Sequence, residues 1–302
     1  MEEMTTGLCP KCGHTLQIPA ELERFSCMYC GERLTKRQLL TQPEEASCSE
    51  EDCAVSFDHA VSRLGWCVQN FRGYQKKILR DAFFEAFETY ETGCAPVIQE
   101  LNSGVRPERQ TELLDRAAEA MLGELSAGWE KKNDMEDEKG ILAIFFVPMV
   151  RKLQLPVSEE FVTLLQKKWV ERYPKSPFYL GDYESISGGF RKKFLGLCFI
   201  TTAVCQELDK PDDCAELTAF RAFRDGYLAA QPDGEALIRE YYNIAPGIVT
   251  CINTCSDRHA SYERIREQYL TPCYEDLLAG RNADCKTRYV QMVRDLEREY
   301  LN

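Results

Sequence analysis

The chain has 302 residues, of which 44% are hydrophobic and 28% charged, a composition typical of globular proteins. Its 37 Lys and Arg against 49 Asp and Glu give a formal net charge of −12, which argues against general binding to polyanions. Fifteen cysteines stand against three histidines, so we do not expect a metal enzyme built on several histidine ligands.

We expect no membrane or secretory segment. The start of the chain is acidic and has no apolar stretch before Cys9. The most apolar runs, residues 141–150 and 194–205, are shorter than the roughly 20 residues that span a bilayer. We therefore expect a cytoplasmic protein whose thiols stay reduced, and an odd number of cysteines also disagrees with a closed disulfide framework.

Two Cys-x-x-Cys pairs lie near the N-terminus. Cys9 and Cys12 form the first pair, Cys27 and Cys30 form the second, and a glycine follows each pair. Two thiolates three positions apart on a tight turn can bind one Zn²⁺, and the glycine permits the left-handed backbone of that turn. The four cysteines therefore predict a closed tetrahedral site for one zinc ion. Such a site leaves no open coordination position, so its role is structural.

The segment between the two pairs has the pattern of short strands. Residues 15–18 alternate between polar and apolar, Pro19 ends that strand, and residues 24–26 begin the return. With the cysteines, this pattern resembles a zinc ribbon over residues 7–36. So small a unit cannot bury enough core to fold alone, so the metal should supply its folding free energy. His14 is not needed as a ligand, and we expect it to face solvent or to lie beside the site.

The ribbon is only slightly basic. Between Cys9 and Arg37 it has five basic and three acidic residues, a net charge of +2. It lacks the interleaved aromatic side chains that single-stranded nucleic acid stacks on. We therefore expect the ribbon to contact a protein, or to be purely structural, rather than to bind nucleic acid.

An acidic linker is predicted at residues 38–55, because residues 41–52 contain five acids, one proline and no base. From Ser56 onward, apolar residues recur at steps of three and four, which is typical of buried helix faces. This spacing predicts a helical domain over residues 56–180. We expect its helices to include residues 56–71, 78–90, 107–125, 141–153 and 158–169.

The glycine pair Gly188-Gly189 predicts a loop or hinge, after which helical spacing resumes. The predicted helices of this last part cover residues 195–208, 216–228, 234–242, 262–270, 272–278 and 284–301.

Three segments of this last part carry a distinctive combination of motifs: CFITTAVC at 198–205, LTAFRAFRDGYL at 217–228 and EYYNIAPGIV at 240–249. Together they resemble the CFI-box C-terminal domain family over about residues 190–255. The resemblance implies a helical CFI-box-like domain, here residues 181–302, and implies no particular reaction. The matching residues are Cys198, Phe199, Ile200, Thr202, Ala203, Arg221, Phe223, Arg224, Asp225, Tyr241, Tyr242 and Pro246.

These residues offer one speculative catalytic centre. A cationic neighbour lowers the pKa of a thiol and makes it nucleophilic, so Cys198 or Cys205 beside Arg224 could react, with Thr201 or Thr202 as a hydrogen-bond donor. On one helix Cys198 and Cys205 would lie about 10.5 Å apart, too far for a disulfide. Arg221 and Asp225 are four positions apart, so on a helix their side chains can form an ion pair. The plainer interpretation is that both cysteines belong to the core.

Cys251, Cys255 and His259 form a Cys-x₃-Cys-x₃-His series. On a continuous helix its outer members lie about 12 Å apart, so the three cannot share one metal ion. Packing is the expected role, and a second metal site remains open.

The sequence thus predicts a mostly α-helical protein with a small N-terminal β zinc ribbon at residues 1–37. The leading function is a cytoplasmic binding or adaptor protein whose ribbon contacts a protein partner. One alternative is a thiol-dependent enzyme using Cys198 or Cys205. Another is a regulator that binds nucleic acid through the ribbon. We expect a binding protein rather than an enzyme.

Overall fold

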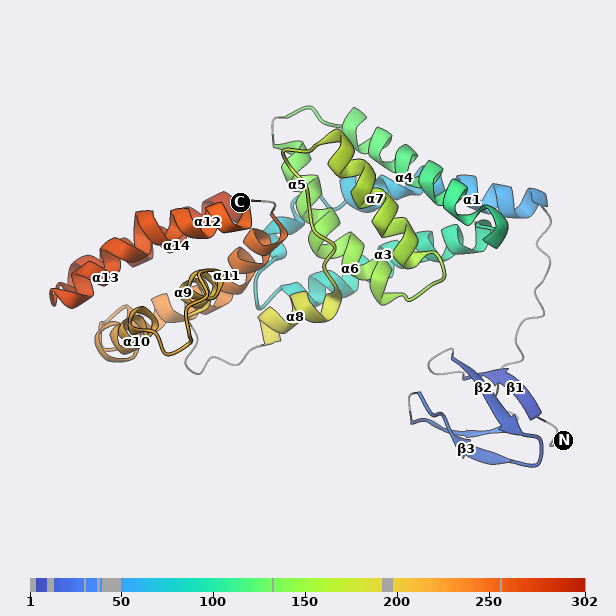
Figure 1. The fold of residues 1–302 in the computed structure, drawn as a ribbon, viewed down its shortest axis with the longest axis horizontal. Helices are drawn as coiled ribbons and strands as arrows, with labels where there is room; N and C mark the ends of the chain where they lie inside the picture. The colour runs from blue at the N-terminus through green and yellow to red at the C-terminus, as the bar shows by residue number, and fades with distance from the viewer. Residues whose placement is uncertain are drawn as a thin grey trace. The chain divides into compact units, whose positions relative to one another are not determined.

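The structure is a computed structural model that describes residues 4–9, 14–29, 31–36, 39, 50–131, 133–191, 198–255 and 257–301. Its contacts divide the chain into an N-terminal unit, Met1–Ala54, and a helical body, Val55–Asn302 (Figure 1). The described chain is mostly helical with small N-terminal sheets, which confirms the prediction of a mostly α-helical protein with a small N-terminal β region. None of the described helices has both the length and the apolar composition needed to cross a membrane.

The N-terminal unit contains two antiparallel hairpins. Strand β1 (Met4–Leu8) pairs with β2 (Thr15–Pro19), and β3 (Arg24–Ser26) pairs with β4 (Arg33–Thr35). In β2 alternate residues are buried, as the sequence pattern predicts. The small core of the unit consists of Cys9, Leu16, Cys27 and Leu34.

The body is built from α-helices, several of them joined end to end. Its first half contains α1 (Glu50–Leu64), α2 (Trp66–Gln69), α3 (Phe83–Gly104), α4 (Gln110–Ala127), α5 (Asp134–Ile141), α6 (Val147–Lys152) and α7 (Ser158–Arg172). Its second half contains α8 (Tyr183–Arg191), α9 (Phe199–Glu207), α10 (Ala215–Ala222), α11 (Gly234–Thr254), α12 (Arg258–Ile265), α13 (Thr271–Leu278) and α14 (Asn282–Tyr300).

Shorter helical turns complete the body. Two are 3₁₀ turns, η2 (Tyr74–Lys77) and η3 (Pro107–Arg109). Three are π-helical: η4 (Leu142–Phe146) joins α5 to α6, η5 (Phe223–Leu228) extends α10, and η6 (Arg266–Leu270) joins α12 to α13. Such π-helical turns are uncommon and often lie at functional sites.

Two predicted loops are partly helical. The predicted linker ends earlier than expected, because Glu50, Glu51 and Asp52 form the first turn of α1, where acidic side chains favour the positive end of the helix dipole. Gly188 and Gly189 lie inside α8, where burial of the apolar helix face outweighs the low helix propensity of glycine. The predicted helix over 195–208 is described from Phe199, and residues 40–49 and 192–197 lie outside the described residues.

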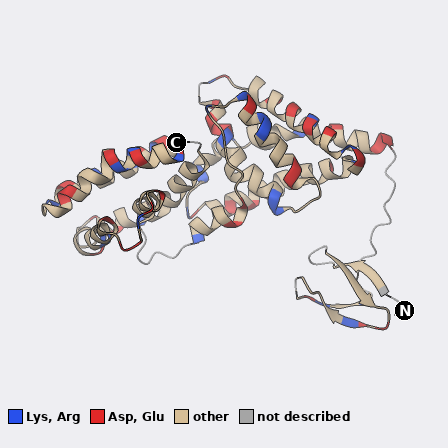
Figure 2. Ribbon diagram, in the orientation of Figure 1, with Lys and Arg blue, Asp and Glu red and all other residues tan. Residues whose placement is uncertain are grey.

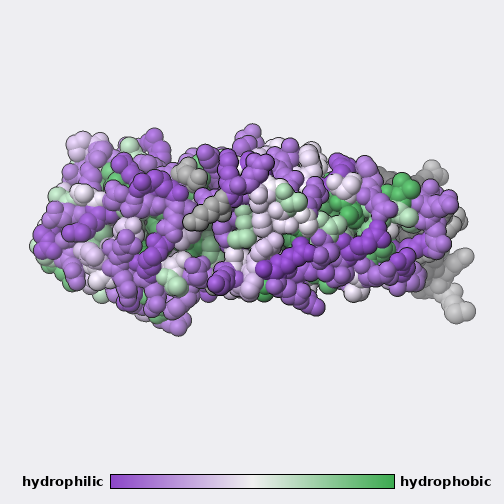
Figure 3. Space-filling model, turned by 90° about the horizontal axis from the view of Figure 1, so that it is seen from above, coloured by the Kyte–Doolittle hydropathy of each residue, from purple (hydrophilic) through white to green (hydrophobic). Residues whose placement is uncertain are grey.

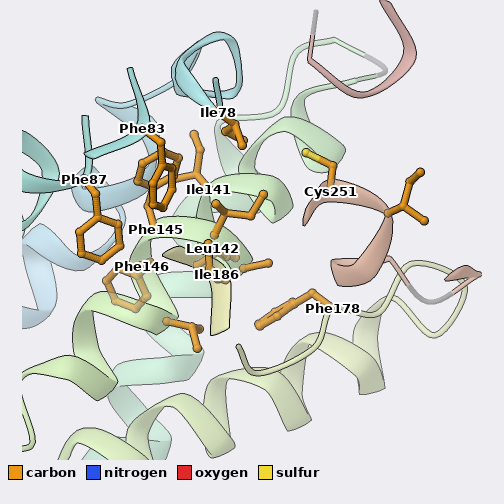
Figure 4. Close-up of a cluster of buried hydrophobic side chains, with 14 of the residues drawn as sticks. Ile78, Phe83, Phe87, Ile141, Leu142, Phe145, Phe146, Phe178, Ile186 and Cys251 are labelled. Atoms are coloured by element: carbon orange, nitrogen blue, oxygen red, sulfur yellow. The ribbon is translucent and has the colours of Figure 1, made fainter. Parts of the chain in front are cut away.

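One hydrophobic core runs through the body, and the predicted boundary between residues 180 and 181 does not separate two cores. Phe83 of α3 stacks on Phe190 of α8, with ring centroids 4.2 Å apart. The rings of Phe83, Phe87 and Phe145 gather in this core near Ile78 (Figure 4). These contacts join segments from both halves, which makes residues 55–302 a single packed unit.

Charged residues of both signs alternate along the outer faces of the helices (Figure 2). Hydrophilic side chains cover most of the face drawn in space-filling form, and apolar ones are confined to smaller areas (Figure 3). Mixed charge of this kind is typical of solvated helix faces.

Candidate functional site

The first candidate site is the pair of cysteine loops in the N-terminal unit. The amide of Cys9 donates to the carbonyl of His14 at 3.0 Å, and the amide of Cys27 donates to the carbonyl of Glu32 at 2.8 Å. Each bond closes a loop that begins at a cysteine directly after a strand: Cys9 follows β1 and Cys27 follows β3. Gly31, which follows the second Cys-x-x-Cys pair, has a φ of +71°, the left-handed conformation that glycine allows.

A ring stack holds the two loops against each other. The imidazole of His14, in the first loop, lies parallel to the ring of Tyr29 in the second, with centroids 4.3 Å apart. Both rings are exposed, as predicted for His14. Cys9 and Cys27, which open the two loops, belong to the same buried cluster. The first cysteines of the two pairs are therefore brought into one small core.

The donor chemistry of these loops fits zinc. Thiolate sulfur is a preferred zinc ligand, and two thiols on adjacent loops supply half of a tetrahedral site. The other predicted ligands, Cys12 and Cys30, lie outside the described residues. Within the described ranges, no three His, Cys, Asp or Glu residues are close enough to hold a metal ion.

The second candidate site surrounds Arg224 in the helical body. Its Nη1 lies 3.5 Å from the sulfur of Cys198 and donates to the hydroxyl of Tyr242 at 3.1 Å. Its Nε and Nη2 form a bidentate pair with the carboxylate of Asp225, at 2.6 and 2.8 Å. The guanidinium is buried, while the carboxylate of Asp225 is largely exposed. The structure therefore brings together Cys198 and Arg224 of the four speculative catalytic residues.

The predicted pairing of Arg221 with Asp225 is wrong. Arg221 instead donates to both the carbonyl and the carboxylate of Asp212, each at 2.8 Å. The reason is the π-helical turn η5, which begins at Phe223 and breaks the four-residue spacing of an α-helix. Asp225 consequently pairs with its own neighbour Arg224.

The thiols of this site are not activated. Burial raises the pKa of Cys198, and this effect outweighs the lowering by the Arg224 guanidinium. Burial and a nearby Cys214 thiol, whose sulfur is 3.8 Å away, raise the pKa of Cys205 to about 12. Arg224 thus lowers the pKa of the Cys198 thiol as predicted, but burial raises it by more, so the net shift is upward.

Thr202 does not join Cys198 and Arg224. Its Oγ1 is buried without a hydrogen-bond partner among the described residues, and its side chain lines a separate cleft of about 590 Å³. The same cleft contains Pro246 and the helical glycines Gly188 and Gly189. Cys205 lies instead beside Cys214, so the four residues form no single constellation.

Several of the residues that carry the CFI-box resemblance contact one another. The hydroxyl of Tyr241 accepts a bond from the amide of Ile200 at 3.0 Å, and Phe199 packs edge-on against Tyr242. Tyr289 of α14 completes the group through its hydroxyl, 3.3 Å from that of Thr201. Sequence reasoning missed Tyr289, because a contact across 88 positions leaves no local signal in the sequence.

A small cavity of about 50 Å³ lies beside Cys198 and Arg224. Its lining is almost entirely aromatic and aliphatic. The helices that form it are α10, η5, α11 and α14, and its apolar lining residues are Phe220, Phe223, Leu228, Leu237, Ile238, Tyr241, Tyr289, Val290 and Val293.

Cys251 and Cys255 line a polar cleft of about 810 Å³, and His259 does not. The imidazole of His259 is exposed and pairs with Glu207 at 3.3 Å. Sequence analysis did not single out the polar cluster in this cleft, where the buried Lys139 donates to Ser176 at 2.7 Å and pairs with Glu136. Lys139 and Glu136 belong to a charged stretch of the sequence, residues 130–139, in which no local pattern marks a buried lysine.

No family model, curated protein or solved structure matches this chain. The geometry of the two sites therefore carries the functional argument.

Proposed function

We propose that the N-terminal unit is a structural zinc ribbon and that it serves as the protein-contact module of a binding protein. The observation that carries this proposal is the pair of side chains exposed on the second cysteine loop. Met28 is 76% exposed and Tyr29 is 57% exposed. They lie directly between Cys27 and the predicted ligand Cys30, so the loop that would bind the metal also presents apolar surface.

The chemistry of these side chains favours a protein partner. Tyr and Met are enriched in the buried cores of protein interfaces, where they supply large contact area. Stacking on His14 fixes the ring of Tyr29, which reduces the conformational entropy lost on binding.

Zinc would supply the rigidity that the small core cannot. Four buried side chains give little hydrophobic stabilisation, and small metal domains commonly fold only with the ion bound. We propose that Cys9, Cys12, Cys27 and Cys30 hold one ion and that its role is structural. Zinc analysis of the purified protein should give one ion per chain, and Cys9→Ser with Cys27→Ser should abolish it.

The contact role is tested by a pull-down that compares the natural chain with a Met28→Ser, Tyr29→Ser variant. We expect the variant to keep its zinc and to lose the captured partner. Leu22→Ser is the matched control, because Leu22 is also exposed but lies in the turn after β2, and it should keep the partner. Unchanged capture by the Met28, Tyr29 variant would reject the contact role.

Nucleic-acid binding makes a different prediction for the same unit. Arg24 and Arg33 are exposed on one face of the β3–β4 hairpin, opposite the buried Leu34. A gel shift that weakens steeply with salt and disappears on Arg24→Glu with Arg33→Glu would favour this alternative. The thiol-enzyme alternative has less support, since burial raises the pKa of both Cys198 and Cys205.

A further inference from the structure

The thiols of Cys205 and Cys214 touch where the end of α9 lies beside the start of α10. We propose that this pair is a redox modification site, at which a small-molecule disulfide oxidises the two thiols to a Cys205–Cys214 disulfide. The site shares no residue with the proposed zinc ribbon. Three features support it: the contact of the two sulfurs, their unequal exposure and the charges around them.

The two sulfurs are already near bonding distance. They lie 3.8 Å apart, although the residues are nine positions apart in sequence. A disulfide requires a distance of about 2.05 Å between the sulfurs. Cys214 is the residue before α10, and its side chain caps no backbone amide, so it can turn toward Cys205 without breaking a helix bond. Side-chain rotation can therefore close the remaining gap.

The connection between α9 and α10 holds the two cysteines together. The chain reverses at Asp209, which has a φ of +53°, and the amide of Lys210 then donates to the carbonyl of Cys205 at 2.9 Å. On the other side of the turn, Arg221 of α10 donates to both the carbonyl and the carboxylate of Asp212. These bonds involve neither thiol, so they position the pair before any oxidant arrives. Such positioning makes the reaction between the two sulfurs effectively unimolecular.

The unequal exposure of the two thiols gives them different roles. Cys214 is partly exposed, whereas Cys205 is only 4% exposed. A dissolved disulfide therefore reaches the sulfur of Cys214 first. Cys205 is shielded from the reagent but lies in contact with Cys214. We therefore assign Cys214 as the attacking thiol and Cys205 as the thiol that resolves the intermediate.

A cation beside the pair favours the thiolate that the first step needs. The ammonium of Lys210 pairs with Glu216. This hydrogen bond raises the pKa of Lys210, and the thiols of Cys205 and Cys214 raise it further, so the ammonium lies near both sulfurs. Burial nevertheless raises the pKa of Cys205. Its step is therefore the slower one, and we expect oxidation to take minutes to hours.

Oxidation proceeds by two thiol–disulfide exchanges. In the first, the Cys214 thiolate attacks a dissolved disulfide, RSSR, and forms a mixed disulfide. The released RS⁻ takes up the proton that Cys214 lost. In the second, the sulfur of Cys205 attacks the sulfur of Cys214, and the second RS⁻ leaves with the proton from Cys205. The pair loses two electrons and two protons, which reduce RSSR to two molecules of RSH.

Two other pairs of thiols provide a comparison within the same chain. The thiols of Cys67 and Cys94 are in contact, and so are those of Cys273 and Cys285. All four side chains are fully buried. These pairs lack the exposed member that begins the exchange, so they should stay reduced while the protein is folded.

The experiment treats the full-length protein with oxidised glutathione and maps its cysteines by differential alkylation and mass spectrometry. In the natural chain we expect a Cys205–Cys214 disulfide that dithiothreitol reverses, and free thiols at Cys273 and Cys285. Cys205→Ser should instead accumulate glutathione on Cys214, because no resolving thiol is left. Cys214→Ser should leave Cys205 unmodified.

Mapping of the natural chain does not depend on how a variant folds, and tryptophan emission followed during the reaction verifies that the body stays folded. The proposal is overturned if Cys214 remains a free thiol, or if glutathione accumulates on Cys214 of the natural chain as it does in Cys205→Ser. It is also overturned if Cys273 and Cys285 oxidise as fast as the pair. All of these cysteines lie in the helical body, so the result is independent of the zinc ribbon.

Discussion

Gly247 of α11 lies directly against the backbone carbonyl of Ile78, so closely that a Cβ on Gly247 would be 1.9 Å from that oxygen. Two hydrogen bonds support this contact. The amide of Arg80 donates to the carbonyl of Asn243 at 2.9 Å, and the amide of Asp81 donates to the side-chain oxygen of Asn243 at 3.1 Å. This backbone contact joins α11 to the segment before α3, and with it the two halves of the body.

Gly247→Ala should therefore destabilise the protein. The new methyl group meets backbone rather than a movable side chain, so the helix must shift, at a cost of about 3 kcal/mol. Chemical denaturation of the body measures the loss. Gly123→Ala is the control, because Gly123 lies within α4 with open space around it and should gain up to about 1 kcal/mol. Equal effects of the two substitutions would contradict the close contact.

Removal of zinc should unfold the N-terminal unit and leave the body folded. All three tryptophans, Trp66, Trp129 and Trp169, lie in the body, so their fluorescence reports on that unit alone. With a strong chelator we expect proteolytic cleavage within residues 4–36 while the tryptophan emission stays constant. A resistant N-terminal unit after verified loss of the metal would contradict a zinc-dependent fold.

Glu138 should be a stabilising buried acceptor. Its carboxylate is fully buried and accepts bonds from Arg72 at 2.8 Å and from the indole of Trp129 at 2.8 Å. Glu138→Ala should cost about 2 kcal/mol, since the Trp129 donor loses its partner while the half-exposed Arg72 can turn to water. Glu138→Gln retains an acceptor and should cost less. Urea unfolding of both variants checks this order.

Stability should fall at alkaline pH partly through Cys205. Burial raises the pKa of Cys205 to about 12, so above about pH 9 the unfolded thiol loses a proton that the native one keeps. This contribution is complete below pH 9 and is lost as pH rises toward 12. Its slope is at most about 1.4 kcal/mol per pH unit.

The alkaline slope is measured by unfolding at a series of pH values. Cys205→Ala should give a shallower slope than the natural chain. Tyr300→Phe should act similarly, because burial also raises the pKa of Tyr300 to about 12. Slopes identical to that of the natural chain would show that these groups do not titrate as the structure implies.

Cys198 should react slowly in the native protein. Burial raises its pKa despite the adjacent guanidinium, and its side chain has little access to reagents. Alkylation at pH 7 should accelerate by about 100-fold or more when the protein is unfolded in urea. A native rate equal to the unfolded rate would restore the thiol-enzyme hypothesis.

Elements with strong local patterns were predictable from sequence. Apolar residues recur at steps of three and four between Leu113 and Leu125, which predicted a helix there, and Leu113, Leu114, Ala117, Met121 and Leu125 are all buried in α4. The alternation in residues 15–18 predicted β2 in the same way. In both cases the signal lies within one element, which is why a single sequence was enough.

The second candidate site, around Arg224, could be predicted only in part. The motif singled out Cys198 and Arg224, but composition gives no sign of the π-helical turn that sets the partner of Asp225. The pairing of Cys205 with Cys214 depends on a sharp reversal at Asp209, whose φ of +53° is unusual outside glycine. Burial, which controls the pKa of both thiols, is likewise a property of the packed body.

Helix α11 forms a wall of the small cavity beside Cys198 and Arg224 near its start, through Leu237 and Tyr241. Near its end it forms a wall of the polar cleft, through Cys251 and Thr254. Ten residues of helix, about 15 Å, separate Tyr241 from Cys251. A substitution that shifts the first part of α11 therefore also moves a wall of the cleft, unless the helix bends at Pro246. The two spaces thus share one mechanical element.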